Sequence, residues 1–321
     1  MTYDLHVHSN CSRHVRRIAP PPAKVVKYAK EAGLLGIALT DHDTGSGIEE
    51  AEEAAKKIGI DLISGIEMSF GYKQSENFYV EGEILGYFID PDYPLIKQVQ
   101  GEMEDKRRLR DSGLRKALDI PKKQIQEFVH DETYSRDDLA DYLVDKGIAV
   151  NRKDAYRILK PEGKSLVERE KTPLEDVVKI IHAAGGVPIV AHFGIIINDY
   201  KLWPEQAFGR EDLKEKKGIP PEYKPERDFE KTLLPVFLEL GIKGFEIYPY
   251  SLVGKGISVI KHGFFNTYAH ELNQRYNLID NIKGSDCHFM KDILTEVGCW
   301  ATELRVVEQL KSEHLKIKNA L

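Results

Sequence analysis

The chain has 321 residues, of which 41% are hydrophobic and 31% are charged, and its formal net charge is −6. This length exceeds one small domain and fits a large α/β barrel, or a domain of about 250 residues with an inserted lobe. The mild acidity argues against a protein held in a stable nucleic-acid complex by bulk charge, and the composition excludes disorder, collagen and coiled coil.

The cysteines and the N-terminus indicate a cytoplasmic protein. Cys11, Cys287 and Cys299 form no CxxC pair, so we interpret them as reduced thiols. The opening MTYDLHVHSN has no apolar stretch behind a basic start and therefore does not resemble a signal peptide. The most apolar run, Gly185–Ile197, is shorter than the roughly 20 residues of a spanning helix, so no membrane partner is expected.

Strands and helices alternate through the first ninety residues. The apolar periodicity predicts strands at Tyr3–Val7, Gly36–Leu39, Leu62–Ile66 and Ile84–Ile89. It predicts amphipathic helices, each ended by glycine, at Pro22–Gly33 and Ile48–Ile58.

The middle of the chain, residues 96–166, is charged and helical, with no good strand. After it, helices are predicted at Pro173–Ala184, Phe229–Leu240 and Thr267–Tyr276, and strands at Val187–Ala191, Gly244–Tyr248 and Ile279–Gly284, before a final strand and helix. About seven βα units with a helical insertion predict a barrel-like parallel sheet. We assign residues 1–95 and 167–321 to this barrel, residues 96–166 to a helical insertion lobe, and residues 198–227 to a long loop excursion.

Metal-binding side chains recur where the predicted strands end, which is where barrels carry their chemistry. The array comprises His6, His8, Asp41, His42, Asp43, Glu67, Glu83, His192, Glu246, Asp286 and His288. In His6-x-His8 and Asp286-x-His288 the two side chains point to one face of a strand, so both can approach one ion. Imidazole and carboxylate together suit zinc, manganese or iron. The array therefore predicts a metal site.

Each member also has a structural interpretation. A lone histidine at a strand end is more often a hydrogen-bonded group than a ligand, and Glu246 could pair with a lysine. Asp43 and Thr44 could cap the next helix. Lys106-Arg107-Arg108 lies in a charged helix, where such a run is most often a solvated face.

A second basic group, Arg13, His14, Arg16 and Arg17, directly follows the His6-x-His8 loop. The arginine fork suits bidentate contact with a phosphate, so these residues are candidates for substrate binding. The chain has no GxxxxGK[ST], GxGxxG or GxSxG, which leaves P-loop, Rossmann and serine-hydrolase functions without support.

Seven motifs in order along the chain resemble the PHP (polymerase and histidinol phosphatase) superfamily. They are DLHVHS at 4–9, TDHDT at 40–44, GIE at 65–67, ILGY at 84–87, HAAGGVPIVAH at 182–192, FEIY at 245–248 and GSDCH at 284–288. The insertion is similar to the small helical lobe of the branch that contains nucleoside 3′,5′-bisphosphate phosphatases and 5′→3′ exoribonucleases. The resemblance implies a distorted (βα)7 TIM-like barrel with two or three divalent ions, of manganese, iron or zinc.

The resemblance also implies a set of ligands. The first ion would take His6, His8, Glu67 and Asp286. The second would share Glu67 and take His192, with a further family histidine falling at Glu83. The third would take His42 and His288 together with an aspartate.

At four positions the chain departs from the family pattern. The aspartate of the third site is Arg13, and Glu83 stands for a histidine, which hardens the second site in favour of manganese or iron over zinc. The lobe has Arg136-Asp137-Asp138 where the branch shows R-P-H, so Arg136 could grip a phosphate that Asp138 would repel. Phe289 stands where a glycine is usual.

The function expected from these residues is hydrolysis of phosphate esters by metal-activated hydroxide, with a small phosphorylated substrate such as a nucleotide or short RNA. Arg13, Arg16 or Arg136 would stabilise charge, and His192 or His288 would protonate the leaving group. Two alternatives remain open. One is an amidohydrolase-like enzyme that cleaves a C–N or C–O bond, and the other is a non-catalytic module that binds a nucleotide.

Overall fold

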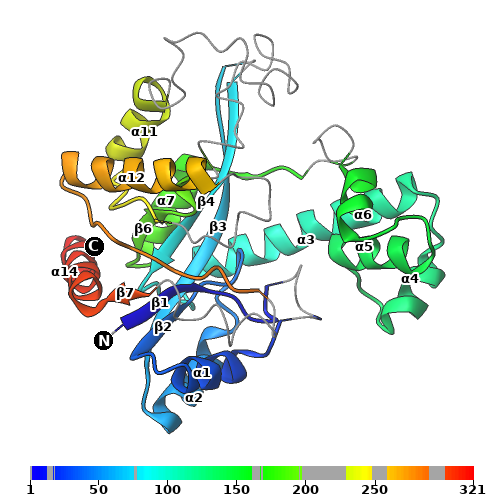
Figure 1. Ribbon diagram of the computed structural model, residues 1–321, viewed down its shortest axis with the longest axis horizontal. Helices are drawn as coiled ribbons and strands as arrows, with labels where there is room; N and C mark the ends of the chain where they lie inside the picture. The colour runs from blue at the N-terminus through cyan, green and yellow to red at the C-terminus, as the bar shows by residue number, and fades with distance from the viewer. Residues whose placement is uncertain are drawn as a thin grey trace.

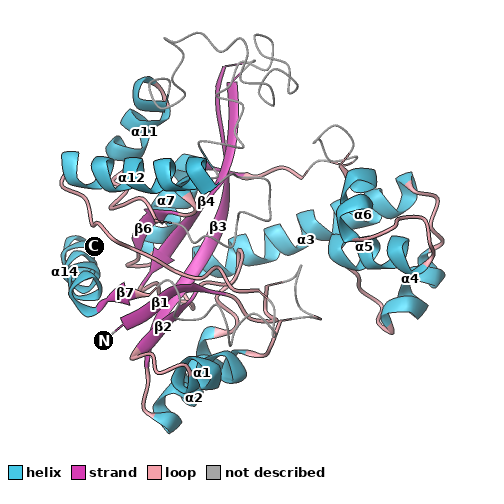
Figure 2. Cartoon of the chain, viewed as in Figure 1, coloured by secondary structure: helices cyan, strands magenta, loops and turns pink. Residues whose placement is uncertain are grey.

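The computed structural model describes residues 2–12, 17, 19–75, 78–160, 167, 169–194, 196, 229–247, 259–288 and 301–321. A curled sheet carries helices on its outside, and a long helix leads from it to a separate group of short helices (Figures 1 and 2). The excursion expected at 198–227, together with Arg13, His14, Arg16 and Phe289, lies outside the described residues.

The first βα units form as the sequence predicts. Strand β1 (Thr2–Val7) pairs in parallel with β2 (Gly36–Leu39), and β2 pairs in parallel with β3 (Asp61–Ser75). Helices α1 (Pro22–Glu31) and α2 (Ile48–Ile58) connect these strands. Helix α2 ends at Gly59, whose φ of 68° is a left-handed conformation that glycine adopts at little cost.

The expectation of a parallel sheet is wrong for the next strands. Strand β4 (Phe78–Tyr87) is antiparallel both to β3 and to β6 (Val187–Val190). Two residues separate β3 from β4, and a connection that short permits only a hairpin, because a parallel crossover needs a dozen residues or more. Both strands are also longer than predicted, so Glu67 and Glu83 lie inside strands rather than at strand ends.

Two short strands and several isolated bridges complete the sheet. Strand β7 (Thr302–Glu303) is antiparallel to β1, and β5 (Thr172–Pro173) is parallel to β3. The strands predicted at 244–248 and 279–284 appear as isolated parallel bridges, Val190 with Phe245 and Ile247 with Lys283, and a further bridge joins Val7 to Cys287. The segment 283–287 lies so close to β1 that a Cβ at Gly284 would collide with the backbone of His6.

The helical middle of the chain forms four helices with a core of their own. They are α3 (Pro94–Ala117), α4 (Lys122–Val129), α5 (Arg136–Asp145) and α6 (Arg152–Leu159). Their buried apolar side chains, from Leu114 to Leu159, make a cluster separate from those of the sheet. Helix α3 spans the distance between the two parts (Figure 1).

The remaining helices cover the sheet. They are α7 (Leu174–Ala183), α11 (Leu233–Glu239), α12 (Val259–Arg275) and α14 (Leu304–Ala320). The largest apolar cluster joins β3, β4 and α7 to α11 and α12. No helix in the described part of the chain is long and apolar enough to cross a lipid bilayer.

Candidate metal centre

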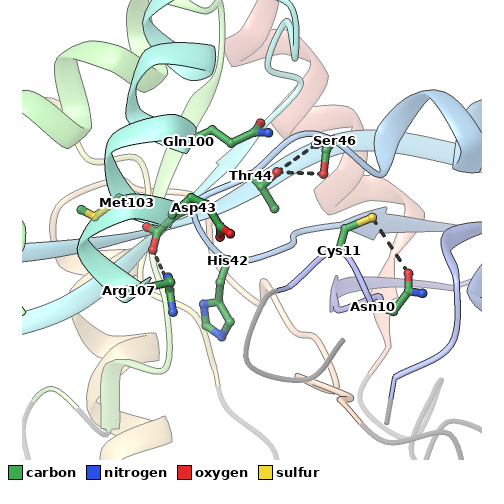
Figure 3. A pocket seen from close by; sticks show the side chains of 10 residues that line it. Asn10, Cys11, His42, Asp43, Thr44, Ser46, Gln100, Met103 and Arg107 are labelled. Carbon is green, nitrogen blue, oxygen red and sulfur yellow. Dashed lines mark hydrogen bonds and ion pairs between the residues drawn. The ribbon is translucent and has the colours of Figure 1, made fainter. Parts of the chain in front are cut away.

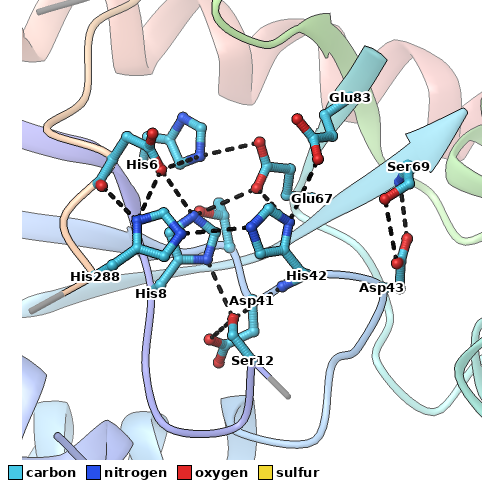
Figure 4. A network of polar contacts seen from close by, with 12 residues as sticks. His6, His8, Ser12, Asp41, His42, Asp43, Glu67, Ser69, Glu83 and His288 are labelled. Atoms are coloured by element: carbon cyan, nitrogen blue, oxygen red, sulfur yellow. Dashed lines mark hydrogen bonds and ion pairs between the residues drawn. The ribbon is translucent and has the colours of Figure 1, made fainter. Parts of the chain in front are cut away.

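Five segments bring histidines and carboxylates together at one end of the sheet. His6 and His8 come from the end of β1, His42 from the turn after β2, and Glu67 and Glu83 from the β3–β4 hairpin. His192 follows β6, and Asp286 and His288 follow the bridge at Lys283. Figure 4 shows the rings of His8, His42 and His288 grouped beside Glu67 and Glu83.

Glu67 lies at the centre of this group. Its carboxylate oxygens lie 2.8 Å from His42 Nδ1, 2.8 Å from His192 Nε2, 3.3 Å from His6 Nε2 and 3.4 Å from His8 Nε2. The side chain is fully buried. Although burial alone would raise its pKa, His42, His6 and His192 hold the pKa of Glu67 well below its usual range.

Asp286 is the second carboxylate that contacts His6 and His8. Its Oδ1 lies 3.2 Å from His8 Nε2 and 3.6 Å from His6 Nε2. Against the effect of burial, His288 and His6 hold the pKa of Asp286 well below its usual range. Asp286 and His192 have positive φ angles of 50° and 37°, a conformation that costs about 1–3 kcal/mol at a non-glycine residue and is frequent at functional sites.

Hydrogen bonds behind the rings fix which nitrogen of three histidines faces the group. His6 Nδ1 donates to Glu246 Oε1 at 2.9 Å, and His288 Nδ1 donates to the carbonyl of Asp286 at 2.7 Å. The hydroxyl of Ser12 donates to Asp41 at 2.7 Å, so it accepts from His8 Nδ1 at 3.2 Å. In each ring Nε2 is therefore the nitrogen available to an ion, as in other metal sites with a carboxylate behind the histidine.

The atoms that face one another fit divalent cations. His6 Nε2, His8 Nε2 and both oxygens of Glu67 are buried and make no hydrogen bond with any described residue. Buried polar atoms without hydrogen bonds are costly and rare, and they need a partner. Four groups of nearby ligand atoms, among the described residues, include these side chains: His6, His8 and Asp286; His42, Glu67 and Glu83; His8, His42 and His288; and His6, His192 and Glu246.

Glu246 plays a part that the sequence did not predict. It is fully buried, accepts from His6 Nδ1 and also accepts from the backbone N–H of His192 at 2.8 Å. The alternative that it pairs with a lysine is therefore wrong. Glu246 lies in the motif FEIY, directly after Phe245, the bridge partner of Val190. The motif predicted the position of this residue but not its role.

Asp43 binds to the lobe's connections, and the expectation that Asp43 or Thr44 caps the next helix is wrong, because the N-cap of α2 is Gly47, with no side-chain cap. The carboxylate of Asp43 accepts from the N–H of Ser69 at 2.8 Å (Figure 4), from Arg107 on α3 (Figure 3), and from Arg169 at 3.4 Å. Against the effect of burial, the two guanidinium groups lower the pKa of Asp43. Arg107 is only 8% exposed, so the expectation of a solvated face is wrong for it.

Arg136 and Asp138 lie on the lobe. The guanidinium of Arg136 lies 5.5 Å from the ring centre of Tyr156, and its Nε makes no hydrogen bond within the described ranges. Asp138 accepts from the N–H and hydroxyl of Ser135 and from Arg17 Nε at 2.8 Å. Because these donors occupy and neutralise the carboxylate, the expected repulsion of a phosphate by Asp138 is largely offset.

The PHP domain family matches residues 4–216 of the chain. The chain belongs to the PHP domain family. It is 34% identical over 224 residues to a 5′-3′ exoribonuclease of Haemophilus influenzae, which is 63% of this chain and 76% of that protein. It is 31% identical over 201 residues to a 3′,5′-nucleoside bisphosphate phosphatase of Chromobacterium violaceum, which is 60% of this chain and 66% of that protein.

Two solved structures share the fold. A protein of Bifidobacterium adolescentis described as a metal-dependent phosphoesterase superimposes with a TM-score of 0.64 at 22% identity, over 97% of this chain and 96% of that one. An amidohydrolase of Chromobacterium violaceum, with bound sulfate and no metal, gives a TM-score of 0.67 at 24% identity, over 98% and 97%.

Proposed function

We propose that this PHP protein is a metal-dependent phosphoesterase that hydrolyses phosphate esters of nucleotides or similar small phosphorylated substrates, including short RNA. The observation that carries the proposal is the fully buried carboxylate of Glu67, which imidazole nitrogens of four histidines approach to within 3.4 Å. The names of the two relatives, an exoribonuclease and a bisphosphate phosphatase, supply the substrate class.

We assign two or three ions of manganese, iron or zinc to this site. His6, His8, Glu67 and Asp286 would hold the first ion. Glu67, His192 and Glu83 would hold the second, supported by the 2.8 Å between His192 Nε2 and Glu67 Oε1. His42 and His288 would hold the third. Divalent ions held there would act as Lewis acids on a phosphoryl oxygen and make water more acidic.

Protein groups supply the remaining chemistry. The carboxylate of Glu67, with other neighbouring acids, raises the pKa of His192 to about 9 despite burial, whereas burial and His8 lower the pKa of His288 well below its usual range. His192 is therefore the better proton donor to the leaving group, and His288 is better suited to be a ligand. Proton donation and ligation by His192 are alternatives, because an ion bound at its Nε2 would displace that proton. Arg136 would bind a phosphate oxygen through its unpaired Nε.

The finer fold and domain assignments also belong to this proposal. We infer that the parallel bridges at Phe245, Ile247, Lys283 and Cys287 close the curled sheet into a distorted (βα)7 barrel. Residues 1–95 and 167–321 would form that barrel and residues 96–166 the lobe. A cytoplasmic location remains a prediction from the sequence.

A substrate panel tests the proposal. Protein loaded with manganese is assayed on adenosine 3′,5′-bisphosphate, 5′-phosphorylated short RNA and a set of amides and lactones. We expect product only from the phosphate esters, and we expect His8→Ala and Glu67→Ala to abolish it. Hydrolysis of amides or lactones alone would instead favour the C–N or C–O hydrolase, and unchanged activity in the two variants would contradict the proposal.

A further inference from the structure

A pocket of about 230 Å³ opens beside the candidate metal centre, and His42 lines both. Its walls come from the loop after β1, the 42–46 turn and one face of α3 (Figure 3). A ligand whose phosphate lies at the metal centre would place its next chemical group in this pocket, because the two spaces share the His42 side chain.

The chemistry of the walls favours a neutral, flat, polar group. Met103 and Cys11 contribute soft apolar surface, and Ser46 and Gln100 contribute neutral polar groups. The guanidinium of Arg107 already binds Asp43, and a carboxylate, that of Glu104, also lines the pocket. A second phosphate would therefore find little free positive charge there.

Gln100 on α3 is the unexplained group in the pocket. Its Oε1 is buried and makes no hydrogen bond with the part of the chain that the structure describes. An unpaired buried acceptor calls for a donor, and a side-chain amide pairs with the edge of a nucleobase through its oxygen and nitrogen together.

We propose that this pocket binds the nucleobase of the substrate and that Gln100 pairs with the edge of that base. The inference rests on the proposed phosphoesterase function. It places a determinant of substrate choice on α3, the helix that connects the sheet to the lobe, and it makes Gln100 a specificity residue rather than a catalytic one.

The test compares a substrate that has a base with one that lacks it. KM is measured for adenosine 3′,5′-bisphosphate and for p-nitrophenyl phosphate in wild type, Gln100→Leu and Gln98→Leu. Gln98 is the matched control, because it lies on the same helix but is exposed and bonds to Glu102. We expect the ratio of the two KM values to rise about fivefold in Gln100→Leu, the effect of one neutral hydrogen bond, and to stay unchanged in Gln98→Leu.

Binding without turnover separates this inference from the proposed function. Adenosine, which has the base but no phosphate ester to hydrolyse, is titrated calorimetrically into each protein in the presence of manganese. Weaker binding to Gln100→Leu than to wild type and Gln98→Leu supports the base pocket even if no ester is hydrolysed. Equal binding by all three proteins, or an equal change of KM for both substrates, overturns it.

Thermal unfolding shows whether Gln100→Leu acts through a loss of fold stability rather than through base recognition. Because Leu removes an unpaired buried acceptor, the melting temperature of Gln100→Leu should equal or exceed that of wild type. A clear decrease in melting temperature, with lower activity on both substrates, would overturn the assignment of Gln100 to base recognition.

Discussion

Arg107 on α3 donates to the carboxylate of Asp43, which lies 64 positions earlier in the chain and directly follows the candidate ligand His42. Arg169, on the segment that returns from the lobe, binds the same carboxylate. Both connections of the lobe therefore meet at the turn that carries His42. The N–H of Asp43 also donates to the carbonyl of Glu67 at 2.8 Å, so this turn holds two candidate ligands together.

Substitution Asp43→Asn should strongly destabilise the fold. It leaves two buried guanidinium groups without their counter-charge, and breaking a buried pair in this way costs about 3–5 kcal/mol. Urea unfolding followed by circular dichroism measures the loss. Asp92→Asn is the control, because Asp92 pairs with Lys97 at the surface and should change stability by less than about 1 kcal/mol. Equal stability of the two variants would contradict a stabilising role for the contacts of Asp43 with Arg107 and Arg169.

Substitution Glu246→Gln should weaken metal binding without unfolding the protein. The amide keeps the shape of the side chain but loses the charge that orients His6, and loss of such a partner typically costs 10–100-fold in metal affinity. Calorimetric titration of manganese into chelator-treated protein measures the metal affinity of the variant. The exposed Glu303, paired with Arg305, gives the control Glu303→Gln. An affinity equal to that of the control would show that Glu246 has no positioning role.

Substitution Glu83→His should shift metal preference toward zinc. It restores the histidine that the family resemblance implies and replaces a hard oxygen ligand by an imidazole nitrogen. Competition between zinc and manganese, followed by element analysis of the dialysed protein, gives the ratio of bound metals. If the ratio in the variant equals that in wild type, Glu83 does not contact the second ion.

Stabilisation by manganese should grow between about pH 6.5 and pH 9. Carboxylates raise the pKa values of His6, His42 and His192 above 6.5, that of His192 to about 9. A raised folded-state pKa contributes stability that is present below the unfolded value and is lost as pH rises through the folded value. The chelated protein therefore loses stability over this window, while ion binding improves as the imidazoles lose their protons.

Differential scanning calorimetry with EDTA and with manganese checks this pH dependence. The pKa values of His8 and His288 are lowered, so these two rings affect stability below pH 6.5. The change in stability above pH 6.5 therefore comes from His6, His42 and His192. A manganese-induced rise in melting temperature that stayed constant from pH 6.5 to 9 would contradict the prediction.

The cluster of ligand candidates was predictable because residue type and spacing are enough to indicate metal-binding side chains. Histidine pairs two apart on strands, and acids at neighbouring strands, indicate one shared face wherever the strands are roughly placed. The hairpin was less predictable. The part of β3 from Met68 to Ser75 includes a glycine and several polar residues, so apolar periodicity alone predicted an end of the strand at Ile66.

The residues behind the ligands could not be predicted from local pattern. Ser12 orients His8 because Asp41 accepts the hydroxyl proton of Ser12 and leaves its oxygen free to accept from the ring. Glu246 orients His6 because the segment 245–247 lies beside β6. Arg107 resembles its exposed neighbour Arg108 in sequence, and only the contact of α3 with the 42–46 turn buries it. Each of these roles depends on contacts between segments that are distant in the chain.

The segment 283–287 packs beside β1, and Ser285 donates to Asp4 across 281 positions of sequence. The centre therefore combines His6 and His8 with Asp286 and His288. During synthesis, which proceeds from the N-terminus, His6 and His8 leave the ribosome about 280 residues before Asp286 and His288. A nascent chain that does not yet contain residues 286–288 lacks two of the candidate ligands, so we expect metal to bind only after this segment has packed beside β1.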